Sequence, residues 1–104
     1  MKVVFHPGFP QDQRKFLADY NAISTGLGDR FRQEIAEAIA SIKGAPTSAG
    51  HFVSSGTGTI KEFRRRNLQA FPFFVLYGWT PGLLVFGSII ASRSDPLNWL
   101  TRFR

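Results

Sequence analysis

Apolar residues along the chain change their spacing several times, and each change predicts a new secondary-structure element. Lys2–Phe5 is a short β-branched and aromatic run, which predicts a first strand. From about Pro10 the apolar residues fall three or four apart, and this spacing predicts a helix that ends at Ser24-Thr25-Gly26. Leu27–Ile42 repeats the helical spacing before Gly44 supplies a stop. The two helices should therefore form an antiparallel hairpin.

The second half of the chain favours strands. Ala45–Thr59 is rich in Gly, Ser and Thr without periodicity, which predicts a surface loop. Ile60–Gln69, Phe73–Trp79 and Leu83–Ile90 are expected to be strands, and the middle one is apolar on both faces, as a central strand is. The tight turn Thr80-Pro81-Gly82 joins the last two strands. This pattern predicts an antiparallel meander.

A short helix is expected near the C-terminus, with Asp95 as its N-cap and Pro96 in its first turn. The 104 residues suffice for one domain, residues 1–104, with a single main core. The order of elements predicts a two-layer α+β fold. In it the N-terminal strand and the helical hairpin pack on a mainly antiparallel sheet of about four strands.

Positive charge is concentrated in the C-terminal half. The formal net charge is +6, from thirteen basic and seven acidic residues. Up to Gly50 there are six basic and five acidic residues, whereas from His51 onward there are seven basic and two acidic ones. This asymmetry indicates an anionic partner for the second half, either nucleic acid or an acidic protein segment.

Several kinds of chemistry are not expected. The chain has no cysteine, which excludes disulfides, thiolate metal sites and thiol nucleophiles. The acidic residues of the helical region, Asp12 and Glu34 among them, are expected to be solvated, and no histidine joins them at metal-ligand spacing. No cofactor or metal is therefore expected. The apolar runs are too short for a membrane span, so we expect a cytoplasmic protein without membrane contact.

A series of short motifs extends over nearly the whole chain. The motifs are His6-Pro7, Tyr20, Leu27-Gly28-Asp29-Arg30-Phe31 with Glu34, Arg65-Arg66, Phe71-Pro72-Phe73 with Tyr77, and Pro96 with Trp99. Each motif alone is weak. In this order they resemble the RelE/ParE superfamily of bacterial toxins, in particular its ParE-like plasmid-stabilisation branch.

The resemblance implies the toxin component of a type II toxin–antitoxin module. Such a toxin inhibits growth and is neutralised by a cognate antitoxin, whose C-terminal segment wraps around it. The complex is expected to bind operator DNA only through the antitoxin. The superfamily is divided in function, because the ParE-like branch poisons DNA gyrase and the RelE-like branch cleaves messenger RNA on the ribosome. Fold alone does not separate these activities.

The positions of the RelE-like catalytic residues favour the gyrase branch. By resemblance they fall at Arg65, Asn67 and Phe74, and Arg93 is the candidate for the late arginine, with no tyrosine after it. We therefore expect a toxin that binds DNA gyrase or another topoisomerase. The alternatives are a ribosome-dependent endoribonuclease that uses Arg65, Arg93 and Lys61, and an attenuated toxin that only binds its antitoxin.

Arg64-Arg65-Arg66 has three interpretations that the sequence leaves open. The first interpretation is an anion-binding patch. The second is a partly structural feature in which one arginine pairs with Glu62 or Asp95, and the third is direct participation in catalysis. The only candidates for catalysis among the basic residues of the strands and the tail are weak, namely Arg65 and Arg93. The residues expected to bind the target or the antitoxin are Lys61, Arg64, Arg65, Arg66, Phe74, Arg93, Trp99 and Arg102.

Overall fold

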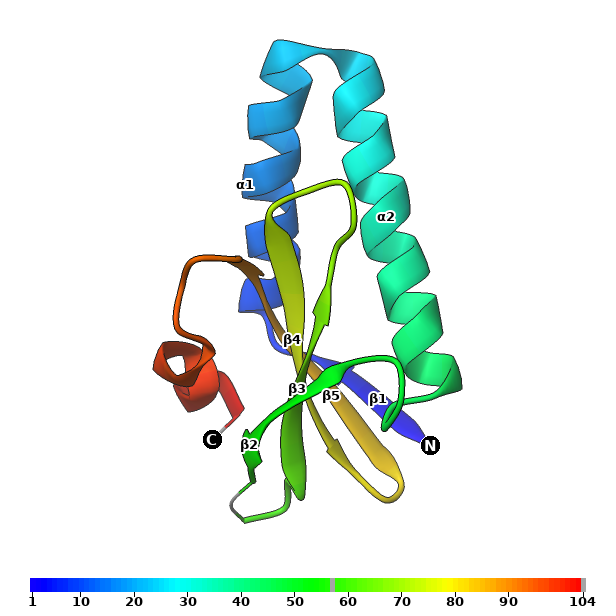
Figure 1. Ribbon diagram of the computed structural model, residues 1–104, viewed down its shortest axis with the longest axis vertical. Coiled ribbons are helices and arrows are strands. Elements are labelled where there is room, and N and C mark those ends of the chain that lie inside the picture. Colours follow the sequence, from blue (N-terminus) through cyan, green and yellow to red (C-terminus); the bar gives the residue numbers. More distant parts are fainter. Residues whose placement is uncertain (57, 104) are drawn as a thin grey trace.

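Two helices form one layer of the structure and a five-stranded sheet forms the other (Figure 1). The computed structural model describes residues 1–56 and 58–103. Thr57, which falls in the predicted loop, and Arg104 lie outside the described residues. The α+β class, the helical hairpin and the short C-terminal helix predicted from the sequence are confirmed. The sheet has one strand more than predicted.

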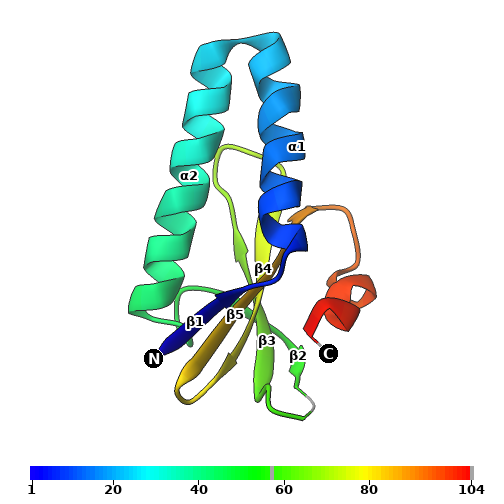
Figure 2. The same ribbon diagram turned by 180° about the vertical axis from the view of Figure 1, so that it is seen from behind.

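The helical hairpin consists of α1 (Gly8–Ile23) and α2 (Thr25–Gly44). Ser24 alone separates them, because its extended backbone ends α1 while its hydroxyl accepts a hydrogen bond from the Leu27 amide at the start of α2. The tip of the hairpin projects beyond the end of the sheet (Figure 2). α1 begins two residues before the predicted Pro10, where the amide of Gly8 donates to Nδ1 of His6.

Most of the sheet is an antiparallel meander, as predicted. The strand order is β1-β5-β4-β3-β2, and only the pairing of β1 with β5 is parallel. β1 forms where the sequence predicts it and lies at one edge. The strands are β1 (Lys2–Phe5), β2 (His51–Ser55), β3 (Glu62–Asn67), β4 (Phe73–Thr80) and β5 (Leu83–Ala91).

The prediction of a surface loop over Ala45–Thr59 was wrong at β2. His51–Ser55 pairs with β3 as an edge strand with an irregularity between Phe52 and Ser54. The strand is short and exposed, and its serines give it no apolar alternation. Its backbone hydrogen bonds to β3 hold it in place, and these leave no signal in the hydrophobic pattern.

Alternate residues of the sheet belong to two different apolar clusters. On the face covered by the hairpin, here the helical face, the main core contains Val75, Tyr77 and Phe86 packed against residues such as Phe31 and Ile35 of α2. The opposite or distal face carries a smaller cluster. Its buried members are Phe74, Leu76 and Ile90. This alternation explains why β4 is apolar on both faces.

The C-terminal 3-10 helix η1 (Pro96–Phe103) covers the distal cluster. Its predicted start is confirmed, because the Asp95 carboxylate accepts a hydrogen bond from the Leu97 amide. Phe103 lies over two glycines of the sheet. A Cβ atom added at Gly78 would come within 3.1 Å of the Phe103 ring, and one added at Gly87 would overlap the ring. The two glycines therefore form the seat of this ring.

Candidate binding surface

The three consecutive arginines of β3 do not form one patch, because successive side chains of a strand point to opposite faces. Arg64 is opposite Tyr77 and Arg66 is opposite Val75, so both lie on the helical face. Arg65 is opposite Leu76 on the distal face. The alternation thus gives each of the three guanidinium groups its own surroundings.

Arg64 has a structural role. Its Nη2 donates to the carbonyl oxygen of Thr47 at 2.6 Å, and its Nε lies 3.7 Å from the Glu62 carboxylate. It thereby ties the segment after α2 to β3. Pairing with Glu62 was one of the interpretations that the sequence left open, and it holds for this arginine.

Arg65 lies flat on the distal face. Its guanidinium carbon is 4.3 Å from the centre of the Phe74 ring, and its Nε donates to the Asn67 side chain at 3.1 Å. His51, the first residue of β2, is directly opposite Arg65 in the strand register and is exposed. Sequence reasoning missed this neighbour of Arg65, because β2 gave no strand signal.

Phe74 was predicted to be part of the binding surface, and this prediction is wrong. Its side chain is fully buried between Arg65 and the residues of η1. The neighbouring Phe73 faces the other way, with its ring 4.4 Å from that of Phe16 on α1. The pair is therefore core on both faces, and only the residues that cover Phe74 can meet a partner.

Arg102 was also expected to bind a partner, but the fold already uses it. Its Nη1 is 2.8 Å from the Asp12 carboxylate of α1 and donates to the Gly87 carbonyl oxygen and the Ser88 hydroxyl. The same Asp12 carboxylate accepts a hydrogen bond from the Ile89 amide. The carboxylate and the guanidinium form hydrogen bonds with backbone groups of β5 that lie beyond its pairing with β1. They also anchor η1. The expectation that Asp12 is a solvated helix residue was therefore wrong.

Trp99 is half-buried within η1. It packs against the distal cluster, with the Arg102 guanidinium 5.1 Å from its ring. Trp99 stays partly exposed, whereas the charge of Arg102 is paired within the fold, so Trp99 is the residue of η1 that remains a candidate for contact with a partner.

Lys61 and Arg93 are exposed and lie apart from Arg65. Lys61 precedes β3, with its ammonium 5.5 Å from the centre of the Trp79 ring. Arg93 lies in the turn after β5, beside a shallow depression that Pro72 and Phe73 also line. In the register of the sheet, Ser88 of β5 lies level with Arg65. Ser88 is three residues, about 10 Å, from the end of β5, and Arg93 follows beyond that end. None of the ion pairs within the described residues involves Lys61, Arg65 or Arg93.

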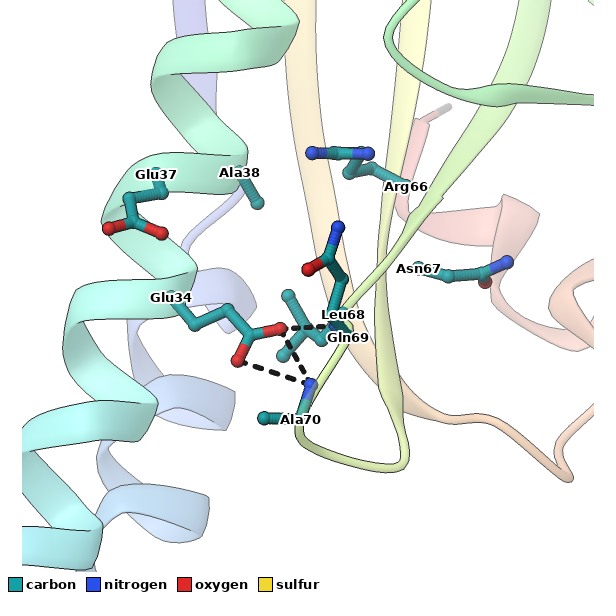
Figure 3. A pocket seen from close by; sticks show the side chains of 8 residues that line it. All are labelled: Glu34, Glu37, Ala38, Arg66, Asn67, Leu68, Gln69 and Ala70. Atoms are coloured by element: carbon teal, nitrogen blue, oxygen red, sulfur yellow. Dashed lines mark hydrogen bonds between the residues drawn. The ribbon is translucent and has the colours of Figure 1, made fainter.

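Glu34 was expected to be solvated, and it is instead bound to the turn between β3 and β4 (Figure 3). Its carboxylate accepts hydrogen bonds from the amides of Gln69 and Ala70. These amides belong to the turn and face α2. The residues of this turn and of α2 line a cleft that also contains Arg66.

The tyrosines do not offer an acid for catalysis. The Tyr77 hydroxyl donates to the carbonyl oxygen of Pro46 at 2.6 Å, and burial in the main core raises the pKa of Tyr77 to about 12. Burial, with the nearby Asp19 carboxylate, also raises the pKa of Tyr20. Neither phenol approaches Arg65, because Tyr77 lies on the helical face and Tyr20 packs among core aromatic rings.

Residues 1–56 and 58–103 contain no group of three histidine, aspartate or glutamate side chains arranged to hold a metal ion. Within the same residues, neither α1 nor α2 is long and apolar enough to cross a membrane. The chain matches no family model, and neither a curated protein nor a solved structure matches it. The class that the structure defines is thus a two-layer α+β domain with a helical hairpin on a five-stranded mixed sheet.

Proposed function

We propose that this protein is the toxin of a type II toxin–antitoxin module of the RelE/ParE superfamily. It acts in the cytoplasm by binding DNA gyrase or another topoisomerase, and a cognate antitoxin neutralises it. The motif series and the hairpin-on-sheet architecture both fit this proposal. Operator DNA is bound by the toxin–antitoxin complex through the antitoxin.

The observation that carries the binding mechanism is the separation of the basic side chains. Arg65 lies on the distal face, Arg66 faces the cleft beside α2, and Arg93 lies in the turn after β5. RNA cleavage needs a base, a phosphate-stabilising cation and an acid within reach of one phosphate. Dispersed cations are suited to contacts across a protein or nucleic-acid surface, where each contributes separately.

One observation favours the alternative, a ribosome-dependent endoribonuclease. His51 and Arg65 are directly opposite each other on β2 and β3, and side chains in that relation come within about 5 Å of each other at Cβ. An exposed imidazole beside a guanidinium supplies a base and a phosphate ligand. In this alternative His51 takes the role of the base, and Arg65 binds the phosphate.

The two mechanisms are separated by expressing the protein in a bacterial host and following both DNA and RNA. Gyrase poisoning gives an SOS response with intact transcripts and loss of supercoiling activity in a purified gyrase assay. Ribosome-dependent cleavage gives cuts within translated messages in a primer-extension map. Such cuts, if they disappear in His51→Ala, would overturn the gyrase proposal.

The binding surface is tested with a double variant, Arg65→Ala with Arg93→Ala. We expect it to lose growth inhibition, because a half-buried cation of the distal face and an exposed cation of the turn after β5 are removed. The matched control is Arg14→Ala with Arg30→Ala, which removes the same charge from exposed helical positions. Equal loss of toxicity in both would mean that net charge, and not this surface, determines activity. A wild-type chain without toxicity that still binds an antitoxin would identify an attenuated toxin.

A further inference from the structure

A cleft between α2 and the turn after β3 contains a guanidinium that the fold does not use (Figure 3). Arg66 extends from β3 toward α2 in this cleft, while Asn67 points to the other side of the strand. The lining residues are Glu34, Glu37 and Ala38 from α2, and Arg66, Asn67, Leu68, Gln69 and Ala70 from β3 and its turn.

Arg66 differs from the other two arginines of β3 in its contacts. Its Nε is buried, and no atom of residues 1–56 or 58–103 accepts a hydrogen bond from it. Nε of Arg64 likewise has no hydrogen bond, but it lies within 3.7 Å of the Glu62 carboxylate. Arg66 is half-buried, so its charge is partly removed from water without an internal acceptor, and an anionic ligand beside the accessible end of its guanidinium would be stabilising.

The two carboxylates of the cleft are engaged elsewhere. The Glu34 carboxylate accepts hydrogen bonds from the amides of Gln69 and Ala70. Glu37 accepts a hydrogen bond from the Gln33 side chain at 3.2 Å and points away from Arg66 (Figure 3). Arg66 thus remains available for an external anion, and Glu37 keeps an exposed negative charge at the rim.

We infer that this cleft binds a peptide segment in which a carboxylate side chain contacts Arg66 and a nearby basic side chain contacts Glu37. Guanidinium binds carboxylate through two parallel hydrogen bonds. A nucleic-acid backbone fits poorly, because its successive phosphates would be repelled by Glu34 and Glu37. The inference stands apart from the toxin proposal, since it depends only on the charges within the cleft.

The test follows the arginine Nε–Hε signals of the purified protein by NMR, assigned by arginine-to-lysine variants. The first probe is a capped tripeptide of glutamate, alanine and lysine, and the second replaces its glutamate by glutamine. We expect the first peptide to shift the Arg66 signal in a saturable way and to leave the Arg64 signal in place. The glutamine peptide should bind about tenfold more weakly, because it lacks the charge-assisted hydrogen bonds.

Two variants and two further probes complete the test. Arg66→Lys should weaken binding of the first peptide about tenfold, whereas Arg65→Lys on the distal face should leave it unchanged. Inorganic phosphate and a single-stranded oligonucleotide should shift Arg66 less than the peptide does. The inference is overturned by an unmoved Arg66 signal, by equal binding of the glutamine peptide, or by stronger binding of phosphate. A shift of the Arg66 signal in peptide-free Glu37→Gln would also overturn it, because it would reveal an internal ion pair.

Discussion

Tyr77 places a polar group among the apolar side chains of the main core, and its surroundings are built around that group. Its hydroxyl donates to the Pro46 carbonyl oxygen, and a Cβ atom added at Gly50 would come within 2.6 Å of the same hydroxyl. The hydrogen bond links the middle of β4 to the segment that follows α2. Tyr77 therefore acts as a structural link between the layers.

Replacing Tyr77 by phenylalanine should lower the free energy of unfolding by about 1–2 kcal/mol, because the partly buried Pro46 carbonyl loses its donor. The measurement is urea unfolding followed by circular dichroism. Tyr20→Phe is the matched control, since the described residues give the Tyr20 hydroxyl no hydrogen bond and the variant should change stability by less than about 0.5 kcal/mol. Equal stability of Tyr77→Phe and the wild type would show that the link is dispensable.

The same tyrosine predicts a pH dependence at high pH. Its pKa is raised to about 12 in the folded protein, compared with about 10 in an unfolded chain. Between these values the unfolded chain loses a proton that the folded chain keeps, so stability should fall as the pH rises from about 10 to about 12. Urea midpoints across this range should decline more steeply for the wild type than for Tyr77→Phe. Parallel declines would mean that other groups, such as lysines, cause the loss.

Single-residue roles were the least predictable part of the site. Asp12 and Glu34 look like solvated helix residues in the sequence, yet each reaches a backbone amide more than thirty residues away in the chain. Helical periodicity does not distinguish a carboxylate that accepts a hydrogen bond from a distant amide from one that is solvated. The division of the arginines, in contrast, follows from strand alternation once the register of β3 is known.

At the scale of elements, η1 is attached to the sheet by apolar side chains, Phe103 among them, and by one ion pair. The Phe103 ring lies on Gly87, and Arg102 pairs with Asp12. Gly87→Ala should displace the Phe103 ring and lower the free energy of unfolding by about 1–3 kcal/mol, which is the usual cost of overpacking a core position. Gly26→Ala is the control, since nothing lies within 4 Å of its added methyl group and the helix should gain about 0.4–1 kcal/mol.

If Gly87→Ala is as stable as the wild type, the ring adapts and η1 is held by other contacts. Arg102→Ala tests the second attachment. It should raise amide hydrogen exchange across Pro96–Phe103 and at Ile89, which donates to Asp12, while β4 stays protected. The matched control is Arg32→Ala, whose exposed pair with Asp29 contributes little. Unchanged exchange in Arg102→Ala would place the anchor of η1 in its aromatic contacts alone.

The elements with strong periodicity were predicted well and the weak ones were not. α2 and β4 have clear apolar patterns, and their spans follow the prediction to within two residues. β2 was missed because an edge strand that ends in two serines needs no apolar alternation to pair with β3. The burial of Phe74 also escaped sequence reasoning, since it depends on η1 folding back over the distal face.

At the scale of the whole molecule, the charge asymmetry of the sequence does not become one basic patch. Arg65 faces the distal side, Arg66 the cleft beside α2, and Arg93 the turn after β5. Arg64 and Arg102 are engaged within the fold. The positive half of the chain thus offers scattered cations on different sides of a small domain.

This arrangement predicts weak and shallow salt dependence for binding to nucleic acid. A strand that can meet only two to four of the cations releases few counterions, so a double-logarithmic plot of affinity for a single-stranded oligonucleotide against salt should have a slope of about −1.5 to −3. Fluorescence anisotropy at several salt concentrations gives this slope. Arg65→Ala and Arg93→Ala should each change it by less than one unit, because neither residue belongs to a common patch. A slope of about −5 or steeper, lost in one of these variants, would instead require a concentrated nucleic-acid site. RNA or DNA, rather than a protein surface, would then be the partner of the basic half.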